Sequence, residues 1–299
     1  MKSIITNIQR FSLADGDGIR TTVFFKGCNM KCSWCHNPET KSCKNELMQY
    51  ASKCIQCLKC ADVCKENAIS FSNGRCTVDR IKCTACGKCA EICYAGALVL
   101  CGTQMTVEDI MNEVRQDKAY YDTSGGGVTL SGGEVLCQRD FATELAKACH
   151  AEGISVAIET NLAFDFEYAS SLLKNVDLLM CDLKIYDESA HKLHTGVSNK
   201  QIIENIQKAD KLGIPVIVRT PLIPGVTDSF ENLSVIANEV KKLKNLVRYE
   251  LLNFNPLGES KYRGLGEENR FESAKPLSPE ELDKIRTVLN KTGIQYKII

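Results

Sequence analysis

The sequence predicts an α/β protein, in which helices cover a parallel β-sheet and a small cysteine-rich domain is inserted near the N-terminus. From about residue 100 onward, β-branched segments alternate with amphipathic helical segments, which is the pattern of repeated βα units. Before that point, two runs of closely spaced cysteines lie within residues 54–93. The 299 residues suffice for one large domain with a smaller insert.

The N-terminal segments lead into a loop of cysteines. Residues 4–9 fit a short strand, and residues 15–20 form a glycine-rich loop. Residues 21–26, Thr-Thr-Val-Phe-Phe-Lys, are β-branched and aromatic and predict a buried strand. We therefore expect the cysteine loop to follow the carboxyl end of a strand.

The cysteine loop carries Cys28, Cys32 and Cys35 in the spacing C-x-x-x-C-x-x-C. A 4Fe–4S cube takes one thiolate per iron, so three cysteines leave one iron open to a small-molecule ligand. The spacing suggests S-adenosylmethionine as that ligand. One alternative is a zinc site completed by His36, although zinc knuckles usually pair two C-x-x-C motifs. The other alternative is a chance clustering of cysteines.

The two cysteine runs of the insert repeat each other. The run C-I-Q-C-L-K-C-A-D-V-C from residue 54 recurs as C-T-A-C-G-K-C-A-E-I-C from residue 83. This is the spacing of bacterial ferredoxins with two clusters, in which each run gives its fourth cysteine to the other cluster. Zinc is the alternative. The predicted ligands are Cys54, Cys57, Cys60 and Cys93 for the first 4Fe–4S cluster and Cys83, Cys86, Cys89 and Cys64 for the second.

Other cysteines and the segments after the insert complete the chain. Six cysteines lack such spacing and are expected to be small buried hydrophobes: Cys43, Cys76, Cys101, Cys137, Cys149 and Cys181. Strands are predicted at residues 127–130, 154–159, 178–183, 216–220, 248–252 and 296–298. Helices are predicted at residues 107–117, 139–151, 166–174, 200–212, 229–244 and 279–290, the last with Ser278 as N-cap.

Composition argues against several classes of protein. The 37 Lys and Arg balance the 37 Asp and Glu, so neither nucleic acid nor an anionic membrane is indicated as a partner. The N-terminus lacks the apolar run of a signal peptide, and we expect a soluble, cytoplasmic protein. Seventeen cysteines in such a chain indicate metal clusters rather than a disulfide scaffold. Exposed clusters would favour an anaerobic setting.

With the flanks of its three-cysteine loop, the sequence resembles the radical S-adenosylmethionine (SAM) superfamily, and within it the glycyl-radical-enzyme activating enzymes. The flanks are D-G-D-G-I-R at residues 15–20 and C-H-N-P-E at residues 35–39. The family usually has proline where this chain has Asp17. The resemblance implies a partial (β/α)6 TIM-like barrel from residues 1–45 and 100–299, and a ferredoxin-like domain from residues 46–99.

The resemblance also implies where the cofactor binds. Barrels of this kind place active sites at the carboxyl ends of strands, where Gly132-Gly133-Glu134 is expected to hold the methionine amino group. Asp182 could also hold a monovalent cation, and the alternative for Asp182 with Lys184 is a solvent ion pair. The predicted cofactor-binding residues are Trp34, His36, Gly132, Gly133, Glu134, Glu159, Thr160, Asp182, Lys184, Arg219 and Asn255.

Three of these predictions have their own reasoning. An arginine that points into a barrel mouth needs an anion, and for Arg219 the cofactor is the candidate. Trp34 is expected to stack on adenine, with a core tryptophan as the alternative. Asn255 stands where many family members have histidine, so it can hydrogen-bond but cannot carry a proton. His191 and His194 are expected to be structural rather than metal ligands.

The implied activity is that of an oxidoreductase. Reductive cleavage of SAM at the Cys28–Cys32–Cys35 cluster gives a 5′-deoxyadenosyl radical, which abstracts a hydrogen from a glycine of a partner glycyl radical enzyme. Asp15, Gly16 and Arg20 are the expected partner contacts, and reduced ferredoxin or flavodoxin is the expected electron donor. Residues 258–276 are expected to form a mobile lid or docking tail. Two alternatives stay open: a radical enzyme acting on a small molecule, and an electron-carrying ferredoxin with an appendage.

Overall fold

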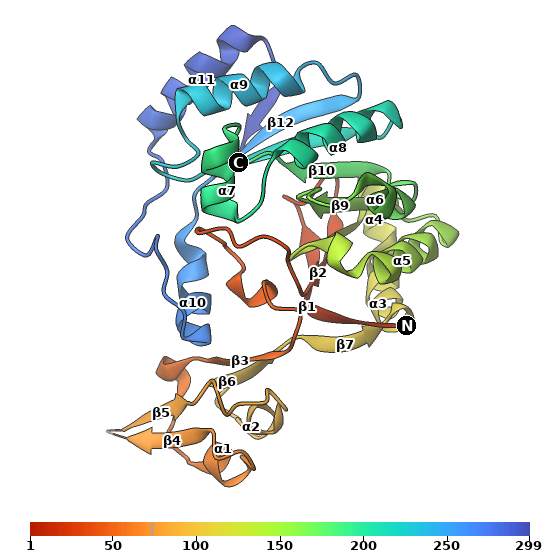
Figure 1. Ribbon diagram of the computed structural model, residues 1–299. Coiled ribbons are helices and arrows are strands. Elements are labelled where there is room, and N and C mark those ends of the chain that lie inside the picture. The colour runs from red at the N-terminus through yellow and green to blue at the C-terminus, as the bar shows by residue number, and fades with distance from the viewer. Residues whose placement is uncertain (73) are drawn as a thin grey trace.

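Figure 1 shows the computed structural model, which describes residues 1–72 and 74–299. Nine strands form one sheet in the order β13-β12-β11-β10-β9-β8-β2-β1-β7. Neighbours from β2 to β13 are parallel, whereas β1 runs antiparallel to both β2 and β7. The strands are β1 (Lys2–Ser12), β2 (Arg20–Phe25), β7 (Thr103–Thr106), β8 (Gly127–Gly132), β9 (Ser155–Thr160), β10 (Leu178–Asp182), β11 (Val216–Leu222), β12 (Leu246–Asn253) and β13 (Tyr296–Ile298).

The predicted parallel sheet is confirmed by the parallel pairing of its strands from β2 to β13, and these strands are largely buried. In β11, with the sequence Val-Ile-Val-Arg-Thr-Pro-Leu, every residue except the proline is buried. Such near-continuous apolar runs are typical of parallel strands between two covered faces. Side chains from β1 (Thr6) through β12 (Leu252) line one common cavity, so the sheet curves around it as a partial barrel.

Helices cover the outer face of the sheet (Figure 1). The predicted N-cap Ser278 is confirmed: its hydroxyl accepts from the Glu281 N–H in a capping box. Within residues 1–72 and 74–299, no helix is both long and apolar enough to cross a membrane. The helices are α3 (Val107–Val114), α4 (Lys118–Ser124), α5 (Arg139–Ala151), α6 (Phe166–Leu173), α7 (Glu188–Thr195), α8 (Lys200–Lys211), α9 (Phe230–Val240), α10 (Glu259–Leu265) and α11 (Pro279–Thr292).

The segment predicted to be a mobile lid or tail is ordered at its start, and that prediction is wrong for α10. This helix packs against the insert, where the Arg80 guanidinium donates to the Gly264 carbonyl at 2.7 Å. Tyr262 on the same helix is only 4% exposed. With seven residues each, α10 and α4 are too short for a helical period to show in the sequence. The eight-residue helix α7 was missed as well.

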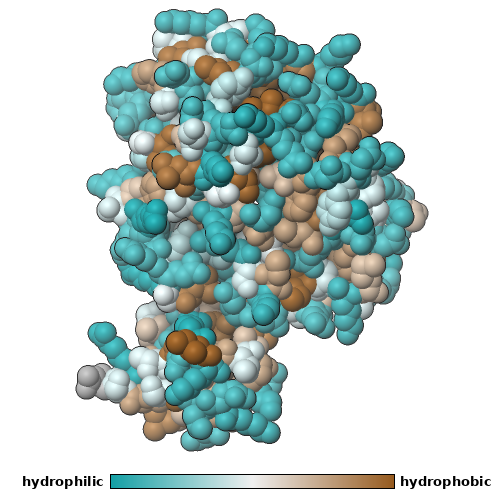
Figure 2. Space-filling model, in the orientation of Figure 1, coloured by the Kyte–Doolittle hydropathy of each residue, from teal (hydrophilic) through white to brown (hydrophobic). Residues whose placement is uncertain are grey.

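The insert forms a smaller lobe beneath the barrel (Figures 1 and 2). Leu58 (φ 63°) and Gly87 (φ 84°) adopt the left-handed conformation at equivalent places, one before each short helix. The repeat in sequence is therefore a repeat in structure. Its elements are β3 (Glu46–Gln49), α1 (Lys59–Asp62), β4 (Ile69–Ser72), β5 (Arg75–Val78), α2 (Lys88–Glu91) and β6 (Leu98–Cys101), with β3 paired to β6 and β4 to β5.

Candidate active site

The inner face of the curved sheet encloses a cavity of about 840 Å³. This volume is within the range of pockets that bind cofactors and small substrates. Cys28, Cys32 and Cys35 form part of its wall. The structure brings all the predicted cofactor-binding residues to this cavity: Trp34, His36, Gly132, Gly133, Glu134, Glu159, Thr160, Asp182, Lys184, Arg219 and Asn255.

Backbone hydrogen bonds hold the three-cysteine loop from two sides. On one side, the Gly27 N–H donates to the Thr40 carbonyl at 2.7 Å. On the other, the Lys31 N–H donates to the Thr195 carbonyl at 2.8 Å, at the carboxyl end of α7. The unpredicted helix α7 is therefore an anchor of the cysteine loop.

The three thiols of this loop are held in their protonated form until iron binds, because burial disfavours the thiolate. Burial raises the pKa of Cys32 to about 11, although the Lys184 ammonium opposes this shift. Burial also raises the pKa values of Cys28 and Cys35. Such thiols keep their protons at neutral pH until metal binding displaces them. Across residues 1–72 and 74–299, no three His, Cys, Asp or Glu side chains are arranged to hold one ion, as a zinc site requires.

Two glycines place the end of β8 against the cysteine loop. A Cβ on Gly133 would lie 2.3 Å from the Gly27 carbonyl oxygen, and one on Gly132 would lie 2.4 Å from the Phe25 nitrogen. The Glu134 N–H donates to the same Gly27 carbonyl at 2.7 Å. Only glycine permits this approach, so the motif fixes the loop as well as bordering the cavity.

The Glu134 carboxylate is 1% exposed and already has three protein donors. It accepts from the Leu136 N–H at 3.0 Å, the Thr160 hydroxyl at 2.7 Å and the Asn161 N–H at 2.7 Å. Burial raises the pKa of Glu134 to about 7, against the effect of these hydrogen bonds. A carboxylate offers about four acceptor positions, so one stays available to a ligand donor.

The anion expected for Arg219 is supplied by the protein, although the cofactor was the candidate for it. Arg219 forms ion pairs with Glu159 and with Glu250, the latter at 2.7 Å. Glu250 also pairs with Arg248 at 2.7 Å, and Arg248 pairs with Asp17 at 2.9 Å. Sequence reasoning missed Glu250, and it gave no role to Asp17, which stands where the family has proline.

Asp182 and Lys184 form an ion pair of 2.7 Å at the end of β10. The Lys184 side chain is 13% exposed, so this is not the solvent ion pair considered as the alternative. Burial lowers the pKa of Lys184, but Asp182 and the neighbouring Cys32 outweigh it and the net direction is upward. Lys184 is thus a charged group beside the cysteines, and it competes with the expected monovalent cation for Asp182.

Of the three predicted partner contacts, Asp15 lines the cavity and Arg20 does not reach the surface. Arg20 is 2% exposed and donates to the Thr129 hydroxyl and the Val128 carbonyl, both at 2.7 Å. Gly16 packs on the Arg20 side chain. The prediction that Arg20 contacts a partner is therefore wrong, because its guanidinium is used inside the sheet.

Trp34 lies between a small hydrophobic cluster and the cavity. It is 7% exposed and packs with the buried Ile185 and Ile223, yet it borders the cavity. His194 lies beside it, with ring centroids 5.8 Å apart. The Trp34 ring therefore presents one surface to the core while it lines the cavity.

Two polar residues of the cavity wall, His36 and Asn255, and the buried His191 contact neighbouring protein groups. Burial and the nearby Lys261 ammonium lower the pKa of His36. The Asn255 side-chain oxygen accepts from the Leu257 N–H at 3.0 Å, which leaves its NH₂ group as the free donor. His191 Nδ1 lies 2.8 Å from the Val197 carbonyl oxygen, as expected for a structural histidine.

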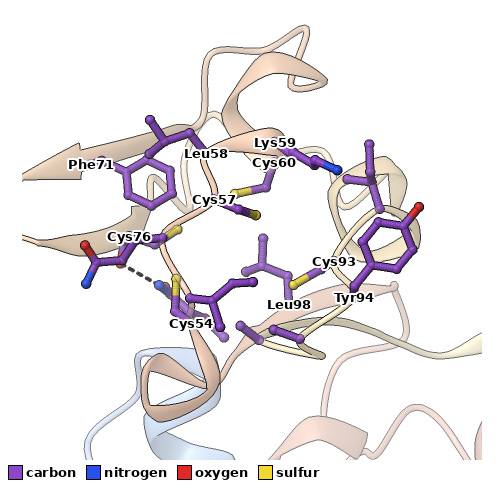
Figure 3. Close-up of a pocket in the computed structure, with 16 residues that line it drawn as sticks. Cys54, Cys57, Leu58, Lys59, Cys60, Phe71, Cys76, Cys93, Tyr94 and Leu98 are labelled. Atoms are coloured by element: carbon purple, nitrogen blue, oxygen red, sulfur yellow. Dashed lines mark hydrogen bonds between the residues drawn. The ribbon is translucent and has the colours of Figure 1, made fainter.

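The cysteines of the insert divide between two small pockets. Figure 3 shows Cys54, Cys57, Cys60 and Cys93 around the first pocket, and Cys76 joins them there. The second pocket is lined by Cys64, Cys83, Cys86 and Cys89. The structure thus gathers the two predicted ligand sets separately, each with the crossed-over fourth cysteine. Cys76 was expected to be a simple buried hydrophobe, and no spacing rule could have placed it there.

Comparison with known proteins adds independent findings. The profile of the Radical SAM superfamily matches residues 82–234, and that of a 4Fe-4S binding domain matches residues 49–70. The chain is 40% identical over 270 residues to the (2S)-3-sulfopropanediol dehydratase activating enzyme of Klebsiella oxytoca, covering 88% of this chain and 85% of that one. It is 37% identical to the trans-4-hydroxy-L-proline dehydratase activating enzyme of Clostridioides difficile, covering 100% and 99%.

A solved structure shares the fold at low identity. The radical SAM methyltransferase from Sphaerobacter thermophilus superposes with a TM-score of 0.53 at 14% identity. The match covers 99% of this chain and 77% of that one. At this identity the similarity concerns the arrangement of strands and helices, and it agrees with the parallel sheet described above.

Proposed function

This chain belongs to the glycyl-radical-enzyme activating enzymes of the radical SAM superfamily, and we propose that it holds SAM in the barrel cavity against a 4Fe–4S cluster on Cys28, Cys32 and Cys35. One observation carries this proposal: the three half-buried cysteines and the predicted cofactor-binding residues line a single cavity of about 840 Å³. The enzyme is thus of the oxidoreductase type.

The protein's own part is to bind, orient and exclude water. When bound, the cluster and SAM supply the chemistry: one electron converts SAM to methionine and a 5′-deoxyadenosyl radical, which takes a hydrogen atom from the partner's glycine. The last acceptor position of Glu134 would receive the methionine ammonium, and Lys184 would face the methionine carboxylate. No side chain has to act as a general acid or base.

The partner class is a glycyl radical enzyme, and the structure supports one route to it. Ala14 and Asp15 line the cavity from the loop that follows β1, so a glycine entering there would meet these residues. We assign partner contact to this loop through Asp15 and Gly16, without Arg20. The named relatives serve two different dehydratases, so the proposal stops at the class of partner.

The insert, taken as a ferredoxin-like domain of residues 46–99, is proposed to hold two further 4Fe–4S clusters and to relay electrons. The first and last strands of the insert, β3 and β6, lie where it joins the barrel. They and the adjoining Tyr50 contribute five side chains to the wall of the barrel cavity: Met48, Tyr50, Val99, Leu100 and Cys101. A reduced ferredoxin or flavodoxin would deliver electrons to the outer end of the insert. We place the reaction in an anaerobic cytoplasm, where such donors and an exposed cluster persist.

The first test is low-temperature electron paramagnetic resonance (EPR) of anaerobically reduced protein, with iron quantified, in the presence and absence of SAM. Wild type should contain about twelve irons and give a signal that changes with SAM. The triple variant Cys28→Ala/Cys32→Ala/Cys35→Ala should keep about eight irons and lose the response. A wild type with about eight irons and no response to SAM would leave only a ferredoxin-like carrier.

A second test separates a protein substrate from a small molecule. The protein is incubated with SAM, a reductant and a glycyl radical enzyme encoded near its gene, grown with glycine deuterated at Cα. Deuterium in the 5′-deoxyadenosine product, with a glycyl radical signal on the partner, is the expected result. Cleavage of SAM with no deuterium transfer from any such partner would favour a small-molecule substrate.

A further inference from the structure

We propose that Cys76 is a fifth thiol of the first insert pocket, which binds no iron but donates an S–H hydrogen bond to the ligand sulfur of Cys60. The donation would raise the reduction potential of the first auxiliary cluster above that of the second. This inference rests on the proposed function, because it requires that the pocket hold a 4Fe–4S cluster.

The Cys76 side chain is buried and turned toward the ligands. On β5 it lies between the exposed Arg75 and Thr77, and it is itself 8% exposed. Figure 3 shows its sulfur on the side of the pocket where Cys54 and Cys60 also lie. Cys76 and Cys60 line the same pocket, and their side chains are within hydrogen-bonding reach of each other.

The strand that carries Cys76 is held against the pocket. The Gln49 side-chain amide donates to the Cys76 carbonyl at 2.5 Å, which ties β5 to β3. Across the hairpin, Cys76 pairs with Phe71, whose ring also lines the pocket. The backbone of Cys76 is therefore held beside the pocket by both neighbouring strands.

Four cysteines with ferredoxin spacing already satisfy the four irons of a cube, so a fifth thiol keeps its proton and acts as a donor. Hydrogen bonds to cluster sulfurs are one of the factors that set the potential of such clusters. A donor stabilises the reduced state more than the oxidised state, because the reduced cluster carries one more negative charge. Among the described residues, the second pocket has its four ligands and no fifth cysteine, so the two clusters become unequal.

The test is a redox titration of the full-length, cluster-loaded protein followed by EPR, comparing Cys76→Ala with Cys76→Ser. The variants Cys57→Ala and Cys86→Ala, each lacking one predicted ligand, assign the two auxiliary signals. In Cys76→Ala we expect the first cluster's ratio of reduced to oxidised form to fall about tenfold at a given potential, which is about 59 mV for one electron. Serine keeps a donor of similar size, so Cys76→Ser should retain the wild-type potential or exceed it.

The outcomes separate this inference from the proposed function. Equal shifts in Cys76→Ala and Cys76→Ser, or no shift in either, would overturn the donor role. A loss of about four irons in Cys76→Ala would overturn it too, because Cys76 would then be a ligand. A wild type without auxiliary signals would overturn the insert's proposed clusters first, and this inference with them. An unchanged second cluster in Cys76→Ala is the expected internal control.

Discussion

Glu250 joins two arginines beneath the active-site cavity, and its replacement tests how much this network stabilises the fold. The carboxylate is 1% exposed and accepts from Arg219 Nε and Arg248 Nε, both at 2.7 Å. Glu250→Gln keeps the volume of the side chain but removes the charge and places an NH₂ group against a guanidinium. Hydrogen bonds to charged groups contribute about 1.5–3 kcal/mol each. Each arginine retains a second carboxylate, so we take the lower value for both and expect a loss of about 3 kcal/mol.

The assay is thermal unfolding of the cluster-loaded protein under anaerobic conditions, followed by circular dichroism at one scan rate. A loss of this size should lower the apparent Tm by about 6 °C, from roughly 2 °C per kcal/mol for a chain of this length. The matched control is Glu144→Gln, because Glu144 makes an ion pair with Lys147 and its side chain is 54% exposed. The control should leave Tm unchanged. Equal Tm values for the two variants would refute the reasoning.

Three further predictions concern the cavity. Gly133→Ala should displace the three-cysteine loop, because its Cβ would lie 2.3 Å from a loop carbonyl; iron analysis should show about four irons lost, whereas Gly153→Ala, which meets no atom within 4 Å, should retain them. Lys184→Met should keep the clusters but weaken SAM binding at least about tenfold in equilibrium dialysis, since it removes the proposed charged partner of the methionine carboxylate of SAM. Unchanged binding would contradict the proposal that Lys184 faces this carboxylate. Burial raises the pKa of Glu134 to about 7, so the folded chain binds a proton that the unfolded chain has released, and this contribution to stability falls as pH rises from about 4 to about 7. In thermal melts from pH 5.5 upward, the Tm of Glu134→Gln should fall less with rising pH than the Tm of wild type. An equal fall in Tm would show that other groups cause the pH dependence.

The cavity residues could be predicted because each motif is local in sequence. Cys28, Cys32 and Cys35 lie within eight residues, and Gly132 to Glu134 directly follow the apolar part of a strand. A parallel sheet brings such strand ends to one side, so no long-range geometry had to be known in advance. The same reasoning placed Ser278 at its helix start, because a capping box is also local.

The residues that were missed or wrongly assigned depend on register. Arg219 and Glu250 meet because they are direct partners between β11 and β12, and sequence does not reveal how two parallel strands are aligned. Arg20 is paired with Gly127, and its guanidinium donates to the next residues of that strand, the Val128 carbonyl and the Thr129 hydroxyl. A glycine-rich loop such as residues 15–20 is normally predicted to lie at the surface. Only the alignment of β2 with β8 shows that its last residue, Arg20, is buried.

The insert enters and leaves the barrel at one point, since Glu46 and Cys101 are direct partners across the β3–β6 pair. A single short turn could therefore close the chain where the insert now stands, and the barrel could keep its path. This is the geometry of an exchangeable module, one that can be gained, lost or replaced by recombination within a loop. The exchange would still have a cost beyond the insert itself, because Met48 and Leu100 form part of the barrel cavity wall. A chain that lost the module would gain an opening beside its cofactor, and a chain that acquired another module would acquire a different wall there.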